Sequence, residues 1–107
     1  MSKIIRVNNV NELNKVLKEN KYVIADFYAD WCPPCKALEP ILENLSKEVT
    51  DVTFIKIDVD HSKELRDKFK ISSIPTLIYF KDNQETTKSF GFIPKPTLLN
   101  NLNNLKK

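Results

Sequence analysis

The sequence predicts an α/β protein whose mixed central β-sheet, of about five strands, is flanked by four helices on both of its faces. Segments with strand patterns and segments with helix patterns alternate along most of the 107-residue chain. This alternation favours parallel strands joined by right-handed crossovers. One segment, YVIADFYA at residues 22–29, is almost continuously apolar and aromatic. A strand of that kind is typically buried on both faces, so we expect it at the centre of the sheet.

The first half of the chain predicts two strands and two helices. In chain order these are a strand at 3–7, a helix at 8–20, the strand at 22–29 and a helix from 35 to about 49. The first helix has Asn8 or Asn9 as its candidate N-cap. The second helix has apolar residues at helical spacing, and Pro40 inside it is expected to kink it.

The second half predicts three further strands and two helices. These are a strand at 52–59, a helix at 62–70, strands at 76–81 and 86–92, and a C-terminal helix at 95–107. The last two strands are joined through DNQE, in which Asp82 and Asn83 tolerate the left-handed conformations of a tight hairpin. The hairpin therefore adds antiparallel strands to a sheet that is otherwise parallel.

Composition indicates one globular domain that spans residues 1–107. The hydrophobic content of 41% is enough for one core, and the net charge is only +3, with lysines interspersed among acids. No nucleic-acid partner is therefore expected. The N-terminal residues lack the apolar region of a signal peptide, and no apolar run approaches the ~18 residues that span a membrane. We expect a cytoplasmic protein without membrane association.

The motif WCPPC holds the only two cysteines of the chain. So close a pair cannot staple a fold as a secreted disulfide framework does, which indicates a redox or metal role. Proline is accepted in the first turn of a helix, so Pro33 and Pro34 predict a helix with Cys32 as its N-cap. The helix dipole then favours the Cys32 thiolate, and the N–H groups of Cys35 and Lys36 are left to point at its sulfur.

The segments ADFYADWCPPCKALEPILENLS, FIKIDVD, SSIPTLIYF and FGF resemble the thioredoxin family in order and spacing, over essentially the whole chain. The resemblance implies a thioredoxin fold and a protein disulfide reductase, with Cys32 as the nucleophile and Cys35 as the resolving thiol. It implies no bound cofactor beyond this redox-active disulfide, with electrons that come from NADPH through a thioredoxin reductase. The substrates it implies are oxidised proteins such as peroxiredoxins, methionine sulfoxide reductases or ribonucleotide reductase, and we expect a monomer.

Asp26 interrupts the most apolar strand, where an unpaired carboxylate would have a raised pKa. Buried acids of this kind are candidate functional residues. The resemblance implies that Asp26 lies beneath the resolving cysteine and helps to deprotonate it, with Lys56 nearby. The alternatives are a strand-edge acid that faces solvent, for Asp26, and a solvated strand residue, for Lys56.

The resemblance also implies a substrate-docking surface around the cysteines. Pro75 alone indicates a turn or a strand start, whereas the family implies a cis Ile74–Pro75 bond whose backbone pairs with an extended substrate segment. Gly91, the only glycine, is expected to need a positive φ or a close backbone approach. The other docking candidates are Trp31, which could instead be a core residue, and Pro33, Pro34, Val59, Phe90 and Phe92.

The motif departs from the common family pattern C-G-P-C because Pro33 replaces the glycine. This leaves open a tryparedoxin-like or oxidising exchanger, and a second alternative is a non-catalytic module that binds another protein through the same fold. A zinc pair or inert thiols are further alternatives for the cysteines. A structural zinc site needs four ligands and His61 is the only histidine, so no metal is expected. We interpret His61 as a solvated residue at a helix start.

Overall fold

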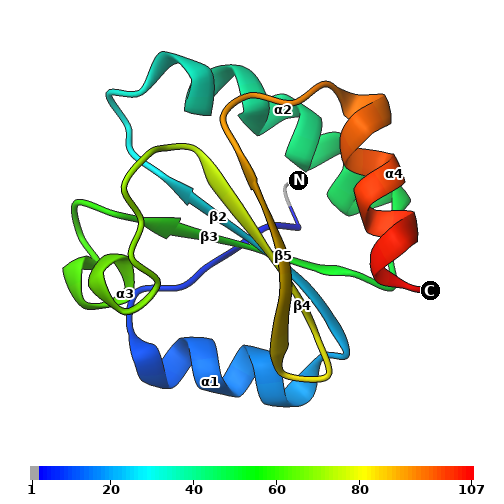
Figure 1. The fold of residues 1–107 in the computed structure, drawn as a ribbon, viewed down its shortest axis with the longest axis horizontal. Coiled ribbons are helices and arrows are strands. Elements are labelled where there is room, and N and C mark those ends of the chain that lie inside the picture. The colour runs from blue at the N-terminus through cyan, green and yellow to red at the C-terminus, as the bar shows by residue number, and fades with distance from the viewer. Residues whose placement is uncertain (1–2) are drawn as a thin grey trace.

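The computed structural model describes residues 3–107, which form one five-stranded sheet and four helices (Figure 1). In chain order the elements are β1 (Ile5–Arg6), α1 (Val10–Glu19), β2 (Tyr22–Tyr28), α2 (Pro33–Glu48), β3 (Thr53–Asp58), α3 (Lys63–Lys68), β4 (Thr76–Lys81), β5 (Gln84–Phe90) and α4 (Lys95–Leu105). Within residues 3–107, no helix is long and apolar enough to cross a membrane.

The sheet has the strand order β1-β3-β2-β4-β5, and the apolar strand β2 lies at its centre. β2 pairs with β3 in parallel and with β4 in antiparallel orientation. β1 and β3 are also parallel, whereas β4 and β5 form the antiparallel hairpin. The mixed sheet predicted from the alternation of elements is confirmed, as is the central place of the apolar strand.

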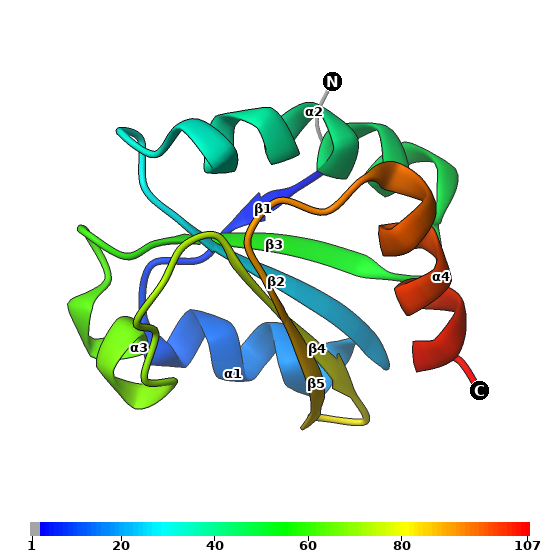
Figure 2. The ribbon, with the colours of Figure 1, turned by 45° about the horizontal axis from the view of Figure 1, so that its top comes forward.

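Helices cover both faces of the sheet, as predicted. α1 and α3 lie on one face, and α2 and α4 lie on the other (Figure 2). Because successive strand residues point to opposite faces, β2 contributes to two cores. Val23, Ala25 and Phe27 pack with the apolar residues of α1 and α3. Ile24 packs with the leucines of α2 and α4.

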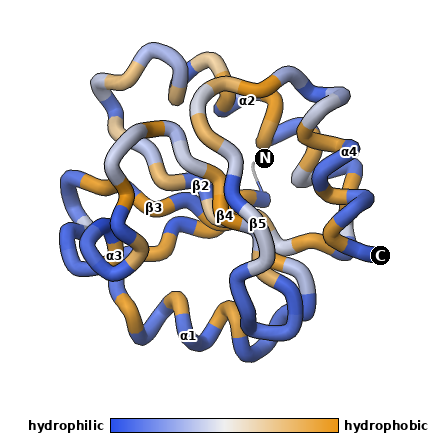
Figure 3. The backbone as a smooth tube through the Cα atoms, viewed as in Figure 1, coloured by the Kyte–Doolittle hydropathy of each residue, from blue (hydrophilic) through white to orange (hydrophobic). Residues whose placement is uncertain are grey.

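Local signals in the sequence explain the element boundaries. Asn9 is the N-cap of α1, where its Oδ1 accepts a hydrogen bond from the Glu12 N–H at 2.9 Å. Asp82 and Asn83, both with positive φ, form the two-residue turn of the β4–β5 hairpin. The segment that joins these strands is hydrophilic, and along α1 hydrophobic and hydrophilic residues alternate (Figure 3).

Several expected boundaries are wrong by a few residues. β1 comprises two residues and not the five expected at 3–7. β5 begins at Gln84, because the tight turn needs only two residues and the strand pairs directly after it. α4 ends at Leu105. α2 continues through Pro40 to Glu48, so this proline does not end the helix, and the kink expected there stays a prediction.

The two neighbouring leucines of α4 allow a test of the core between α2 and α4. Leu98 is fully buried, whereas Leu99 is 36% exposed. We expect Leu98→Ala to lower the free energy of unfolding by about 2–5 kcal/mol because it leaves a cavity. Leu99→Ala should cost less than about 1 kcal/mol. Urea unfolding of the oxidised proteins measures both, and equal losses would contradict this packing.

Candidate functional site

The two cysteines form a disulfide at the start of α2, just after the carboxyl end of β2. Cys32 is the N-cap, with extended backbone, and Pro33 and Pro34 occupy the first two helical positions as predicted. The N–H of Cys35 donates to the sulfur of Cys32 at 3.3 Å. The N–H of Lys36 instead donates to the Cys32 carbonyl oxygen at 3.1 Å, as the first regular helical bond. The expectation that Lys36 also points at the sulfur is therefore wrong.

Both cysteines are almost covered in this oxidised form. The exposed fraction is 2% for Cys32 and 4% for Cys35, whereas Pro33 and Pro34 are exposed. Within residues 3–107, no group of three or more histidine, cysteine, aspartate or glutamate side chains could hold a metal ion. The disulfide itself engages both sulfurs, so the arrangement is one of thiol exchange.

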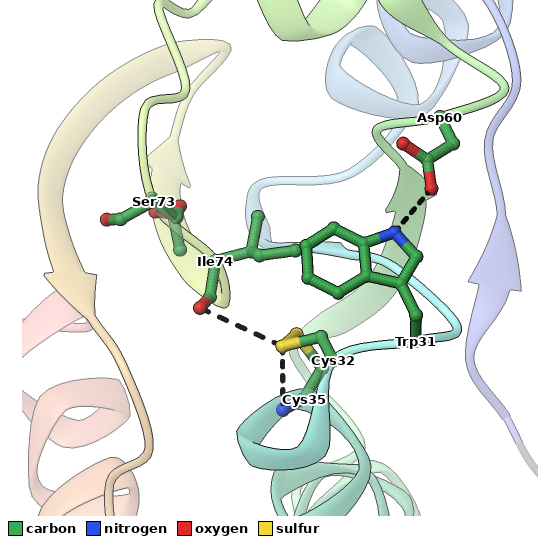
Figure 4. Close-up of a disulfide and its surroundings, with 7 residues drawn as sticks. Trp31, Cys32, Cys35, Asp60, Ser73 and Ile74 are labelled. Carbon is green, nitrogen blue, oxygen red and sulfur yellow. Dashed lines mark hydrogen bonds between the residues drawn. A yellow bond between two sulfur atoms is a disulfide. The ribbon is translucent and has the colours of Figure 1, made fainter.

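The Ile74–Pro75 peptide bond is cis, as the family resemblance implied. It places the carbonyl oxygen of Ile74 3.8 Å from the sulfur of Cys32, a contact that Figure 4 shows. A disulfide sulfur carries no proton, so this contact can become a hydrogen bond only when Cys32 is a thiol. The Pro75 carbonyl accepts a hydrogen bond from the Gly91 N–H at 2.8 Å, which joins this segment to the end of β5.

Trp31 lies on the surface beside the disulfide and is not a core residue. It is 67% exposed, and its Nε1–H donates to Asp60 Oδ2 at 2.8 Å (Figure 4). A hollow of about 200 Å³ lies between Trp31 and Ile74. Val59 lines this hollow but is only 5% exposed, so it contributes a buried wall rather than an open contact surface.

Backbone conformation, and not crowding by neighbouring atoms, explains the glycine at position 91. Its φ is +78°, and a Cβ added there would meet no atom within 4 Å. The expectation of a positive φ or a close backbone approach is therefore confirmed by the positive φ. Phe90 and Phe92, on either side, are 64% and 47% exposed and form an apolar border beside the cis peptide bond.

Asp26 is buried in β2, on the face covered by α2, and it is only 8% exposed. The alternative of a solvent-facing acid at a strand edge is wrong. Asp26 and Cys35 line the same cavity of about 300 Å³, together with Glu39 and Lys56. The pKa of Asp26 is raised to about 7, mostly by burial and in addition by the charge of Glu39, whereas the charge of Lys56 acts in the opposite direction.

Lys56 is half-buried and lies opposite Asp26 in the register of β2 and β3. Its Nζ lies 5.7 Å from the ring centroid of Tyr28, a cation–π contact. The side chain lines the Asp26 cavity but remains partly exposed, so the functional role of Lys56 stays a prediction.

A family model described as Thioredoxin matches residues 3–104. The chain belongs to the thioredoxin family. It is 47% identical over 92 residues to a thioredoxin of Mycoplasmoides gallisepticum, and the alignment covers 86% of this chain and 92% of the relative.

Solved structures agree with this assignment to the thioredoxin family. A mutant thioredoxin from Halobacterium salinarum matches with a TM-score of 0.93 and 34% identity, over 98% of this chain and 92% of that one. A chain from a structure on the thiol-resolving mechanism of yeast mitochondrial 1-Cys peroxiredoxin via glutathione/thioredoxin systems matches with a TM-score of 0.90. It is 31% identical, over 97% of this chain and 99% of that one.

Membership of the thioredoxin family, together with a Cys32–Cys35 disulfide, makes the protein a thiol–disulfide oxidoreductase. Its reaction is protein disulfide reduction by dithiol–disulfide exchange. In the family, a reductase supplies the electrons and disulfides are the substrates.

Reasoning from the sequence missed two residues of this site. Asp60 was not singled out, because its bond to Trp31 joins residues 29 positions apart. Glu39 carried a usable signal, since it lies four residues after Cys35 and residues at that spacing share a helix face. His61 is exposed and precedes α3, as expected, with Nε2 4.0 Å from Asp58 Oδ2.

The raised pKa of Asp26 predicts how stability depends on pH. The native state keeps the Asp26 proton up to about pH 7, whereas an unfolded chain releases it near 3.8. The contribution of Asp26 to the free energy of unfolding is therefore fully present below pH 3.8. It is lost as the pH rises through about 7. At about 1.36 kcal/mol per pH unit, this interval corresponds to a loss of about 4 kcal/mol.

Asp26→Asn lacks this loss because the amide does not titrate. We expect its free energy of unfolding to rise relative to the unsubstituted protein by up to about 4 kcal/mol between pH 4 and pH 8. Urea unfolding of the oxidised proteins measures the difference, with the exposed Asp67→Asn as control. A difference that is the same at pH 4 and pH 8 would show that Asp26 is not held neutral.

Proposed function

We propose that the protein is a general reductant of protein disulfides, with Cys32 as the attacking thiol and Cys35 as the resolving thiol. The observation that carries this assignment is the asymmetry of the disulfide. Cys32 lies against the Ile74 carbonyl and next to the exposed Trp31, whereas Cys35 lines the cavity of the buried Asp26. The Cys32 sulfur thus lies on the side of the candidate docking residues, which supports its role as the attacking thiol.

The reaction begins with the thiolate of Cys32, which attacks one sulfur of the substrate disulfide and releases the other as a thiolate. Cys35 then transfers its proton to the Asp26 carboxylate. Its thiolate attacks the Cys32 sulfur, so the Cys32–Cys35 bond forms and the bond to the substrate breaks. The substrate leaves with two reduced sulfurs, and the two electrons it gained come from the two cysteines.

Substrate docking follows from the surface around Cys32. The Ile74 backbone next to the cis bond is suited to pair with an extended segment of the substrate, as a short added strand. Such pairing reads the main chain and tolerates many sequences. Contacts with side chains of the substrate come from the exposed Trp31, Pro34 and Phe92, and from the backbone at Gly91.

The chain works as one cytoplasmic domain over residues 1–107, as a monomer and without a bound cofactor. Electrons come from NADPH through a thioredoxin reductase. The yeast structure matched above concerns a peroxiredoxin and supports that class of substrate. Methionine sulfoxide reductases and ribonucleotide reductase are the other substrate classes that the reaction fits.

Cys35→Ser tests the roles of the two cysteines. Without the resolving thiol, the substrate stays bound to Cys32, so we expect covalent complexes that accumulate at least tenfold over the unsubstituted protein. Gel electrophoresis without reductant detects them, and a reductant should release them. The matched control is Cys32→Ser, which should form none. Equal trapping by both variants would contradict the assignment.

The reduction potential of the Cys32–Cys35 pair tests the direction of the reaction. We expect a two-electron transition well below about −230 mV, on the reducing side of the glutathione pool. Thiol alkylation in graded dithiol buffers measures it, with Pro33→Gly as the comparison variant. A transition near or above about −200 mV would instead indicate an oxidising or isomerising protein.

A further inference from the structure

Glu39 is an acidic residue of the Asp26 cavity to which the exchange reaction above gives no role. The cavity is lined mostly by residues of β2, β3 and α2, and its acidic side chains include the buried Asp26 and the exposed Glu39. Oδ1 of Asp26 has no hydrogen-bond partner among residues 3–107. A buried carboxylate without such a bond responds strongly to any nearby charge.

Helix and strand geometry both direct these groups into one space. Cys35 and Glu39 are four residues apart in α2 and therefore lie on the same face, one turn from each other. Asp26 and Lys56 are register partners of the parallel strands β2 and β3, so their side chains point to the same side of the sheet. That side is the one covered by α2.

The two charges at the rim of this cavity act on Asp26 with opposite sign. The carboxylate of Glu39 disfavours a second negative charge on Asp26, whereas the ammonium of Lys56 favours it. Burial adds to the effect of Glu39. The protonation of Asp26 therefore depends on a balance that a single substitution on the exposed face of α2 can change.

We propose that Glu39, one helical turn from Cys35 at the rim of the Asp26 cavity, is a positioning residue for the resolving step and acts through Asp26. This inference rests on the proposed role of Asp26 as the acceptor of the Cys35 proton. A base that is half ionised near the working pH combines a sufficient ionised fraction with sufficient basicity. Through this effect Glu39 would adjust the basicity of Asp26 to disulfide exchange near neutral pH.

The other titratable groups around the cavity do not replace Glu39 in this role. β4, on the other side of Asp26, pairs Leu77 with it and brings no charge there. Besides Glu39 and Lys56, the titratable residues that line the cavity are Tyr28, Asp30, Cys35, Lys36 and Glu43. None of these contributes to the shift of the Asp26 pKa, and Cys35 is held in the disulfide in the oxidised protein.

Glu39→Gln provides the test, because it removes the charge and keeps the size of the side chain. The matched control is Glu43→Gln, which removes a carboxylate from the same cavity one turn further along α2. The first measurement is the titration of the Asp26 side-chain carboxyl by carbon NMR in the oxidised proteins. We expect the midpoint to fall by roughly half a pH unit in Glu39→Gln and to stay in place in Glu43→Gln.

The second measurement is the pH dependence of the resolving step. Reduced protein is mixed with a protein disulfide such as that of insulin, and acid quenching followed by mass spectrometry gives the fraction held as the Cys32 mixed disulfide. Below the Asp26 midpoint, Glu39→Gln should resolve about twofold faster, because more Asp26 is ionised. Well above the midpoint it should be equal or slower, because the base is weaker.

The outcomes separate this inference from the proposed function. A crossover in the rate that accompanies a lowered midpoint supports the role of Glu39. An unchanged midpoint in Glu39→Gln overturns it, even if Asp26→Asn slows resolution. Asp26→Asn that resolves at the unsubstituted rate at every pH overturns the role of Asp26, and the inference about Glu39 with it. A rate change that is equal at every pH shows a merely structural effect and also overturns the inference.

Discussion

The burial of one carboxylate in the central strand is the constraint on which the rest of the site depends. Asp26 lies in β2, between β3 and β4, so its backbone is held on both sides. Its side chain faces the helix that carries both cysteines. An ionised carboxylate at this depth is unfavourable, and the fold holds the group near the point where it releases its proton. A residue that weakens the fold above neutral pH thus lies beside the thiol that needs a base.

The start of α2 places a second constraint on the chemistry. Pro33 and Pro34 have no N–H, and the first helical bond takes the N–H of Lys36. The sulfur of Cys32 accepts a backbone hydrogen bond from the N–H of Cys35. A thiolate at this position is therefore stabilised by the helix dipole and one hydrogen bond. Glycine in place of Pro33 would restore a donor to this turn, which is why the potential of that variant is informative.

The parts of the fold that local chemistry determines could be predicted from the sequence. The apolar run of β2, the Asn9 cap and the Asp82–Asn83 turn each depend on residues close in the chain, and each was found in its predicted place. The acceptor of the Lys36 N–H was predicted wrongly, because capping and helical hydrogen bonds compete for the same donors. The Trp31–Asp60 bond was missed since it forms only after β2 and β3 have paired.

The disulfide separates two tasks that a single exposed cysteine would have to combine. Cys32 faces the cis peptide bond and the exposed Trp31, where main-chain pairing can select substrates of many sequences. Cys35 faces the cavity, where desolvation and the opposite charges of Glu39 and Lys56 set the proton affinity of the base. One turn of α2 separates the two environments. Substitutions on the docking side can therefore change which disulfides are reduced without changing the pH at which they are resolved.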